Sequence, residues 1–340
     1  MTALKTVKNI ANAVIVFAAV SFIIYLLLDR TDRITPADVD SSIQRGQSYL
    51  VQAYNDQHTY EDSYLECSPK YTYYYICDPR LKRIDASIDL IWIRDEVQNH
   101  TLIDYQIRDA ERFLAEQDKY LETQPFFNTQ NLFIADQHCI LASMYNDTKI
   151  TKDVESIVKP YGWTEENVLD DENKFRKIAF ESWCVMLLAE KGSNRSTAIT
   201  LSEYMLNESL YIIQETNTPA LPKAYGALHT LWVFKKLKTL GYDINPYAPK
   251  LKVLQDYIAS AADDPSVVAD TEAQTMFLMI LSDYNYSQDT NRRIAVRIMD
   301  RQDAGGWWNA NVHEPSDFAR AFTTLHAIMA LNRYKLAYMS

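Results

Sequence analysis

Four carboxylates stand inside apolar segments of the sequence, where an ionisable side chain is rare. Asp89, Asp136, Glu181 and Glu272 lie in the runs "IDLIWI", "FIADQHCILASM", "IAFESWCVMLLA" and "EAQTMFLMIL". A carboxyl group beside an apolar wall stays neutral and can donate a proton, whereas an ionised neighbour can act as a base or nucleophile. These four residues are therefore the candidate catalytic residues, and the chemistry they predict is general acid–base catalysis.

Other side chains in similar segments are candidates for binding a ligand, namely His138, His229, Trp308 and Arg320. His326 has a similar setting, and a hydrogen-bonded place in the core is the alternative for polar residues of this kind. The histidines show no H-E-x-x-H spacing and are not combined with paired cysteines, so we predict no metal site. Nothing in the sequence resembles G-x-G-x-x-G or a P-loop, and we predict no cofactor.

Helices must position these residues, because the apolar periodicity is helical from about residue 36 onward. Segments with a single apolar stripe lie near 36–54, 103–118, 152–159, 197–215, 246–261 and 289–302. Each precedes a segment that is apolar nearly all round, and those segments start near Ile84, Leu132, Lys177, Lys223, Ala269 and Asp317. On this placement the four carboxylates fall in first helical turns, where complementing the helix dipole is their structural alternative.

The starts of the apolar segments are about 46 residues apart, which is typical of a repeat architecture. A helix that is apolar all round must be covered on several sides, whereas a striped helix buries one face. We therefore predict an all-α fold of six helical hairpins, with six inner helices walled by six outer ones in a closed ring. An armadillo-like solenoid has a similar period and is the competing architecture. The last helix is as apolar as the middle ones, which favours closure.

The segment "QDAGGWWNANVHEPSDFARAFTTLHAIMAL" resembles the repeat of the α/α-toroid superfamily of terpene cyclases and protein prenyltransferases. In that repeat a Q-x-x-x-G-x-W segment joins an outer helix to an inner one, and here Gln302 and Gly306 are followed by paired tryptophans. We expect the glycines to permit a tight turn and Trp307 and Trp308 to seal the last repeat against its neighbour. The resemblance implies an (α/α)6 toroid.

The acidic motifs of the cyclases, D-x-D-D and D-D-x-x-D, do not occur in the sequence. The stretches "LDDEN" at 169–173 and "ADDPS" at 262–266 fail the spacing and are typical of helix caps or loops. Six-hairpin glycosidases and polysaccharide lyases share the toroid and carry acidic residues at its mouth. This resemblance implies a glycan-active hydrolase, in which the separation of two carboxyl groups distinguishes retaining from inverting hydrolysis.

Two other classes of function remain open on the sequence. The first is a non-catalytic toroid that binds a glycan, a lipid or an envelope protein, or that serves as a structural component. The second is a terpenoid- or isoprenoid-processing enzyme. A nucleic-acid partner is excluded, because the net charge is −11 and the surface would repel a phosphate backbone.

The amino terminus predicts a membrane anchor. Residues 10–28, "IANAVIVFAAVSFIIYLLL", carry no charge and are long enough to cross a hydrocarbon core of about 30 Å. Lys5 and Lys8 precede this run, and no convincing cleavage site follows it, so we predict an uncleaved signal anchor with a cytoplasmic amino terminus. The predicted domains are therefore residues 1–33, a cytoplasmic stub with the anchor, and residues 34–340, an extracytoplasmic toroid.

Cysteines and glycosylation sequons agree with export. Cys67 and Cys77 flank a tyrosine-rich loop, and we predict a disulfide between them, as oxidising compartments permit. Cys139 and Cys184 lie one repeat apart and are either a second disulfide or two core thiols. N-x-[ST] sequons, which predict glycosylation, occur at Asn99, Asn146, Asn194, Asn207 and Asn285.

Overall fold

The computed structural model of the 340-residue chain is helical, which confirms the all-α prediction. It describes residues 34–54, 60, 79–117, 137, 139–141, 143–144, 171–191, 195–312 and 320–339. Within these ranges there is no strand, only isolated bridges that pair Tyr54 with Tyr60 and Asp270 with Asn311.

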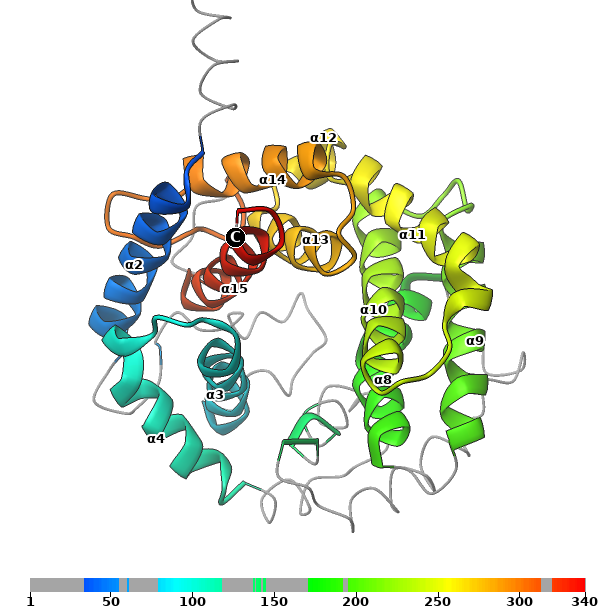
Figure 1. Ribbon diagram of the computed structural model, residues 1–340, viewed down its shortest axis with the longest axis horizontal. Coiled ribbons are helices and arrows are strands. Elements are labelled where there is room, and N and C mark those ends of the chain that lie inside the picture. The colour runs from blue at the N-terminus through cyan, green and yellow to red at the C-terminus, as the bar shows by residue number, and fades with distance from the viewer. Residues whose placement is uncertain are drawn as a thin grey trace, which may run out of the picture.

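The helices fall into an outer and an inner group (Figure 1). The outer group comprises α2 (Pro36–Ala53), α4 (Asp104–Leu114), α9 (Arg195–Ile212), α11 (Ala248–Ala261) and α14 (Gln288–Asp300). The inner group comprises α3 (Pro79–Glu96), α8 (Asp171–Lys191), α10 (Ala220–Thr239), α13 (Thr271–Asp283) and α15 (Arg320–Tyr338). Short elements at Thr101–Ile103, Asn245–Tyr247 and α12 (Pro265–Val268) lie in the connections.

Burial explains why each helix takes its place. In α13 every residue from Ala273 to Ser282 is buried, so this helix must be covered on all sides. In α14 the buried positions follow one stripe that includes Asn291, Ile294, Ala295 and Ile298, and the opposite face is free for solvent. The predicted contrast between striped and all-round apolar helices is confirmed for these two elements.

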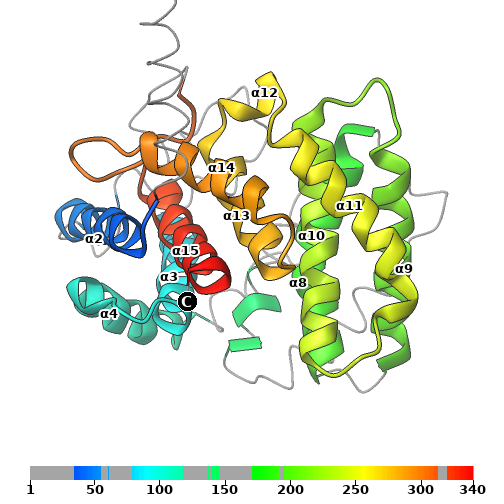
Figure 2. The same ribbon diagram turned by 45° about the horizontal axis from the view of Figure 1, so that its top comes forward.

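Neighbouring inner helices pack side by side around the centre of the molecule. Helix α8 contacts α10, α10 contacts α13, α13 contacts α15, and α15 contacts α3. Helix α2, the first described helix, also packs against α15, the last one, so the two ends of the described chain meet (Figures 1 and 2). An ion pair between Lys335 and Asp40, 2.6 Å from Nζ to Oδ1, joins the same two helices.

The glycine pair beside the tryptophans serves this junction. Gly306 adopts a φ of +97°, and a Cβ there would lie 2.4 Å from the carbonyl oxygen of Arg45 on α2. Gln302 fixes the approach, because its amide donates to the carbonyl oxygens of Ser42 and Gly306, each at 2.9 Å. Trp308 has no exposed surface and donates from Nε1 to the carbonyl oxygen of Ile298 at 2.7 Å. The ring of Trp308 also lies against Gly46, where a Cβ would come within 3.0 Å of it, so Trp308 packs the end of α14 against α2.

Two predicted helix starts are wrong by more than a turn. Helix α3 starts at Pro79 rather than near Ile84, and α8 starts at Asp171 rather than near Lys177. The reason is that polar first turns such as "PRLKR" continue these helices beyond the apolar core, where an apolar pattern gives no signal. The carboxylate of "ADDPS" does cap a helix, since Asp264 accepts a hydrogen bond from the backbone N–H of Ser266 at 2.8 Å.

A disulfide links Cys139 to Cys184 on α8, which decides between the two alternatives left open for this pair. Cys67 and Cys77 lie outside the described residues, so their predicted disulfide stays a prediction.

Of the sequons, Asn99, Asn207 and Asn285 are exposed, and Asn146 and Asn194 lie outside the described residues.

The predicted anchor, residues 10–28, also lies outside the described residues. Among the helices that are described, none is long and apolar enough to cross a membrane.

Candidate functional site

Two of the four predicted carboxylates interact within one buried cluster at the centre of the molecule. Asp89 of α3 and Glu272 of α13 act electrostatically on each other and on His326 of α15. Asp136 lies outside the described residues, and the side chain of Glu181 on α8 is not described either. The structure therefore describes the side chains of only two of the four predicted catalytic residues.

The centre of the cluster is a histidine–carboxylate pair. His326 Nε2 lies 3.5 Å from Asp89 Oδ1, and the two residues are 5% and 3% exposed. Burial alone would lower the pKa of His326, but Asp89, Glu272 and Asp85 together hold it above its ordinary value. His326 Nδ1 and Asp89 Oδ2 are buried and have no hydrogen-bond partner within the described part of the chain.

Asp85 completes the cluster, and the sequence analysis missed it. It lies one helical turn before Asp89 on the same face of α3. Burial, with the charge of Asp89, raises its pKa well above the ordinary value, although His326 and a hydrogen bond from Gln137 oppose this. The i, i+4 spacing of two aspartates in "IDASIDLIWI" was the available signal, because both must face the same neighbours.

Glu272 has the pKa that best suits a proton donor near neutral pH. Burial, followed by the charge of Asp270, raises the pKa of Glu272 to about 7, and His326 opposes the shift. Glu272 is the second residue of α13, where the helix dipole favours its charged form. Asp270 caps the same helix by accepting from the backbone N–H of Ala273 at 2.8 Å.

The prediction that the carboxylates all occupy first turns holds for Glu272 but is wrong for Asp89 and Glu181. Each of these is the eleventh residue of its helix, counting from Pro79 and from Asp171. The helix dipole acts only within the first and last turns. It therefore gives no structural reason for a buried carboxylate at position 89.

A cavity of about 360 Å³ opens among the inner helices and reaches the other side of His326. Its apolar wall consists of Trp92, Trp183, Trp232, Met186, Met279 and Met329. The rings of Trp92 and Trp183 are stacked, with centroids 4.9 Å apart and planes 17° from parallel. The volume lies at the small end of the range that ligand pockets occupy, about 300–1,000 Å³.

Charged groups form the rim of this cavity, and they are already paired. Arg333 donates to Glu96 Oε2 at 2.7 Å and to Asp283 Oδ2 at 2.8 Å. Lys236 Nζ lies 2.7 Å from Glu190 Oε2. Lys235, which also lines the cavity, donates to the backbone carbonyl oxygen of Asp283 at 2.5 Å, so the rim combines hydrogen-bond donors and acceptors.

The predicted ligand-binding residues do not gather at one place. His229 is buried on α10, accepts or donates a hydrogen bond with Ser182 Oγ at 3.1 Å, and meets the ring of Trp232 edge-on. Burial lowers its pKa to about 3, so it is neutral. Trp308 has no exposed surface and does not line the cavity, so its role in ligand binding stays a prediction.

Arg320 lies over the ring of Trp307, 4.9 Å from its centroid, and donates to Asn309 Oδ1 at 3.1 Å. It therefore holds the loop after α14 instead of facing the cavity. His138 lies outside the described residues.

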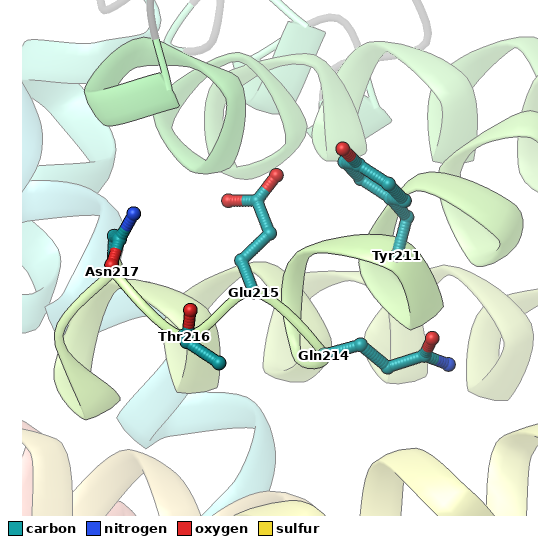
Figure 3. Close-up of a pocket in the computed structure, with 5 residues that line it drawn as sticks. All are labelled: Tyr211, Gln214, Glu215, Thr216 and Asn217. Atoms are coloured by element: carbon teal, nitrogen blue, oxygen red, sulfur yellow. The ribbon is translucent and has the colours of Figure 1, made fainter.

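A second hollow lies on the surface where α9 turns into α10 (Figure 3). It is lined by Tyr211, Gln214, Glu215, Thr216 and Asn217, and the side chain of Glu215 points to the same side as that of Tyr211. These residues come from one helix end and one turn, with a single carboxylate among them. The arrangement offers no pair for acid–base chemistry.

Across the described ranges, no group of three or more His, Cys, Asp or Glu side chains is arranged to hold a metal ion. No protein-family model matches the chain, and neither does any curated protein or solved structure.

Proposed function

We propose that residues 34–340 form an (α/α)6 toroid of six helical hairpins, held outside a membrane by the segment at 10–28. The alternation of outer and inner helices and the meeting of α2 with α15 support a closed ring. Between α4 and α8 lie residues 115–170, a length that accommodates one more hairpin of a period of about 46 residues. The Cys139–Cys184 disulfide and the exposed sequons support an oxidising, extracytoplasmic location.

Within the toroid, we propose glycan hydrolysis at the cluster of Glu272, Asp89 and His326. With its pKa raised to about 7, Glu272 is half protonated at that pH, and its protonated form donates a proton to the glycosidic oxygen of the leaving group. Asp89, paired with His326, supplies the negative charge that activates water or attacks the sugar carbon directly. The observation that carries this proposal is the pairing of a raised-pKa glutamate with a second carboxylate among inner helices.

The experiment compares release of reducing ends from a polysaccharide panel by the full chain, by Glu272→Gln and by Asp289→Asn. We expect Glu272→Gln to lose about a hundredfold or more of the rate, because general acid catalysis contributes roughly that factor. Asp289 is an exposed carboxylate, 78% accessible, and serves as the matched control with an unchanged rate. Full activity in Glu272→Gln would exclude it as the acid.

A non-catalytic glycan-binding toroid is the second candidate, and the tryptophan-lined cavity favours it. Indole rings and a polar rim can recognise a ligand by stacking and hydrogen bonding alone. In that case the wild-type chain would bind glycans and release no reducing ends from them.

A further inference from the structure

The cavity shares His326 with the carboxylate cluster but opens away from Glu272. Glu96, Thr239 and Asp283 line it, and they are the last residues of α3, α10 and α13. The carboxyl ends of three inner helices therefore share one opening. Glu272 is the second residue of α13, so eleven residues, or about 16 Å of helix, separate it from Asp283 at the rim.

We propose that this cavity is a second carbohydrate site, which holds a short neutral saccharide without cleaving it. The choice of ligand class rests on the proposed glycan-directed function, but the site does not depend on catalysis. His326 belongs to both the cavity and the carboxylate cluster, but neither Glu272 nor Asp89 lines the cavity.

The wall of the cavity fits the faces of sugar rings. The rings of Trp92 and Trp183 stack nearly parallel on each other, and both residues line the cavity together with Trp232. The face of an indole carries negative charge density. The C–H groups on the face of a pyranose ring carry weak positive charge, so a sugar ring stacks on such a surface.

The rim selects a neutral ligand. Glu96, Asp283 and Arg333 already satisfy one another, Lys236 is paired with Glu190, and Lys235 donates to the carbonyl oxygen of Asp283. A charged ligand would have to compete with these partners for the same donors and acceptors. A hydroxyl group both donates and accepts, so a saccharide can add hydrogen bonds to the network and leave its charges paired.

The rim of the cavity argues against a purely apolar ligand such as an alkyl chain. Lys235, Lys236 and Arg333 line the opening. An alkyl chain would remove water from these charged groups and offer them no hydrogen bond, whereas the hydroxyl groups of a saccharide replace that water.

The test titrates the full chain, in a detergent without a sugar headgroup, with cellobiose, maltose and lactose while intrinsic tryptophan fluorescence is recorded. We expect at least one disaccharide to give a saturable change. Thr239→Tyr, which fills the rim from an exposed position, should weaken this binding about tenfold or more. Lys238→Tyr, at the adjacent exposed position that does not line the cavity, should leave the binding unchanged.

Glu272→Gln separates this site from the proposed catalytic one, because it should abolish hydrolysis and retain the fluorescence change. Saccharide binding with no hydrolysis in any chain would remove the proposed catalysis and leave this site standing. The site is overturned if no disaccharide binds, if binding survives in Thr239→Tyr, or if only tetradecanol gives a change that Thr239→Tyr removes.

Discussion

At the scale of single residues, Glu272 couples the candidate chemistry to folding. Burial and Asp270 raise its pKa from 4.5 to about 7, with Asp89 and His326 also facing it. Between these two values the folded chain binds more protons here than the unfolded chain does. The free energy of unfolding therefore falls as pH rises through this window, by a total on the order of 1–3 kcal/mol.

Glu272→Gln removes this titration, so its free energy of unfolding should depend less steeply on pH between 4.5 and 7 than that of the wild type. His326 remains in the variant. Because its pKa is raised, the free energy of unfolding still decreases as pH rises above 6.5. Urea unfolding at several pH values measures the difference, with Asp289→Asn as the control. Parallel curves for wild type and Glu272→Gln would show that Glu272 is not held protonated.

Gly306 and Gly241 form a matched pair, since both have positive φ, +97° and +82°. An alanine at 241 meets nothing within 4 Å, so Gly241→Ala should cost about 1 kcal/mol of backbone strain. At 306 the added Cβ would lie 2.4 Å from the carbonyl oxygen of Arg45, so Gly306→Ala should cost about 3 kcal/mol or more. Thermal unfolding measures both, and equal costs would contradict the close junction of α2 with the glycine turn.

At the scale of elements, the disulfide fastens α8 to residues 139–141. It spans 45 residues of chain, and the loop-entropy account gives a stabilisation of about 3–4 kcal/mol. The variant Cys139→Ala/Cys184→Ala should lose about this much in urea unfolding, independently of Cys67 and Cys77. An unchanged unfolding midpoint in the double variant would contradict that role.

The sequence predicts that the described helices exist, and which of them have one apolar face, better than it predicts where they start and end. Periodicity reports burial, so the all-round apolar α13 and the striped α14 are recognisable from their residues alone. The polar first turn of α8 carries no such signal, and its start is misplaced for that reason. The four-residue helix α12 begins at Pro265 after a capping aspartate and is too short for periodicity to show.

The candidate site was only partly predictable, for a similar reason. A carboxylate in an apolar run is visible in the sequence, which is how Asp89 and Glu272 were found. Which carboxylates lie near each other depends on how α3 and α13 pack against α15. The same packing places Asp85 and His326 in the cluster. Trp308 shows the converse limit, because an aromatic residue beside glycines can seal a core as readily as it can bind a ligand.

At the scale of the whole molecule, the proposed topology exposes the surface of the domain to glycosylation. Asn99, Asn207 and Asn285 are exposed, so an exported domain expressed in eukaryotic cells should carry glycans at these positions. Glycosidase treatment should increase gel mobility, and replacing the three asparagines with glutamine should reduce that shift. A chain that shows no shift on glycosidase treatment would contradict the extracytoplasmic placement.

The central claim is that the ring positions Glu272 as a neutral acid beside a second carboxylate, and the pH dependence of kcat/KM for glycan hydrolysis tests it most directly. The account predicts that kcat/KM falls as pH rises, with an apparent pKa near 7 that reports deprotonation of Glu272. The residual activity of Glu272→Gln should lack this falling limb. A rate that stays level or rises between pH 6 and 8, or the same limb in Glu272→Gln, would contradict the account.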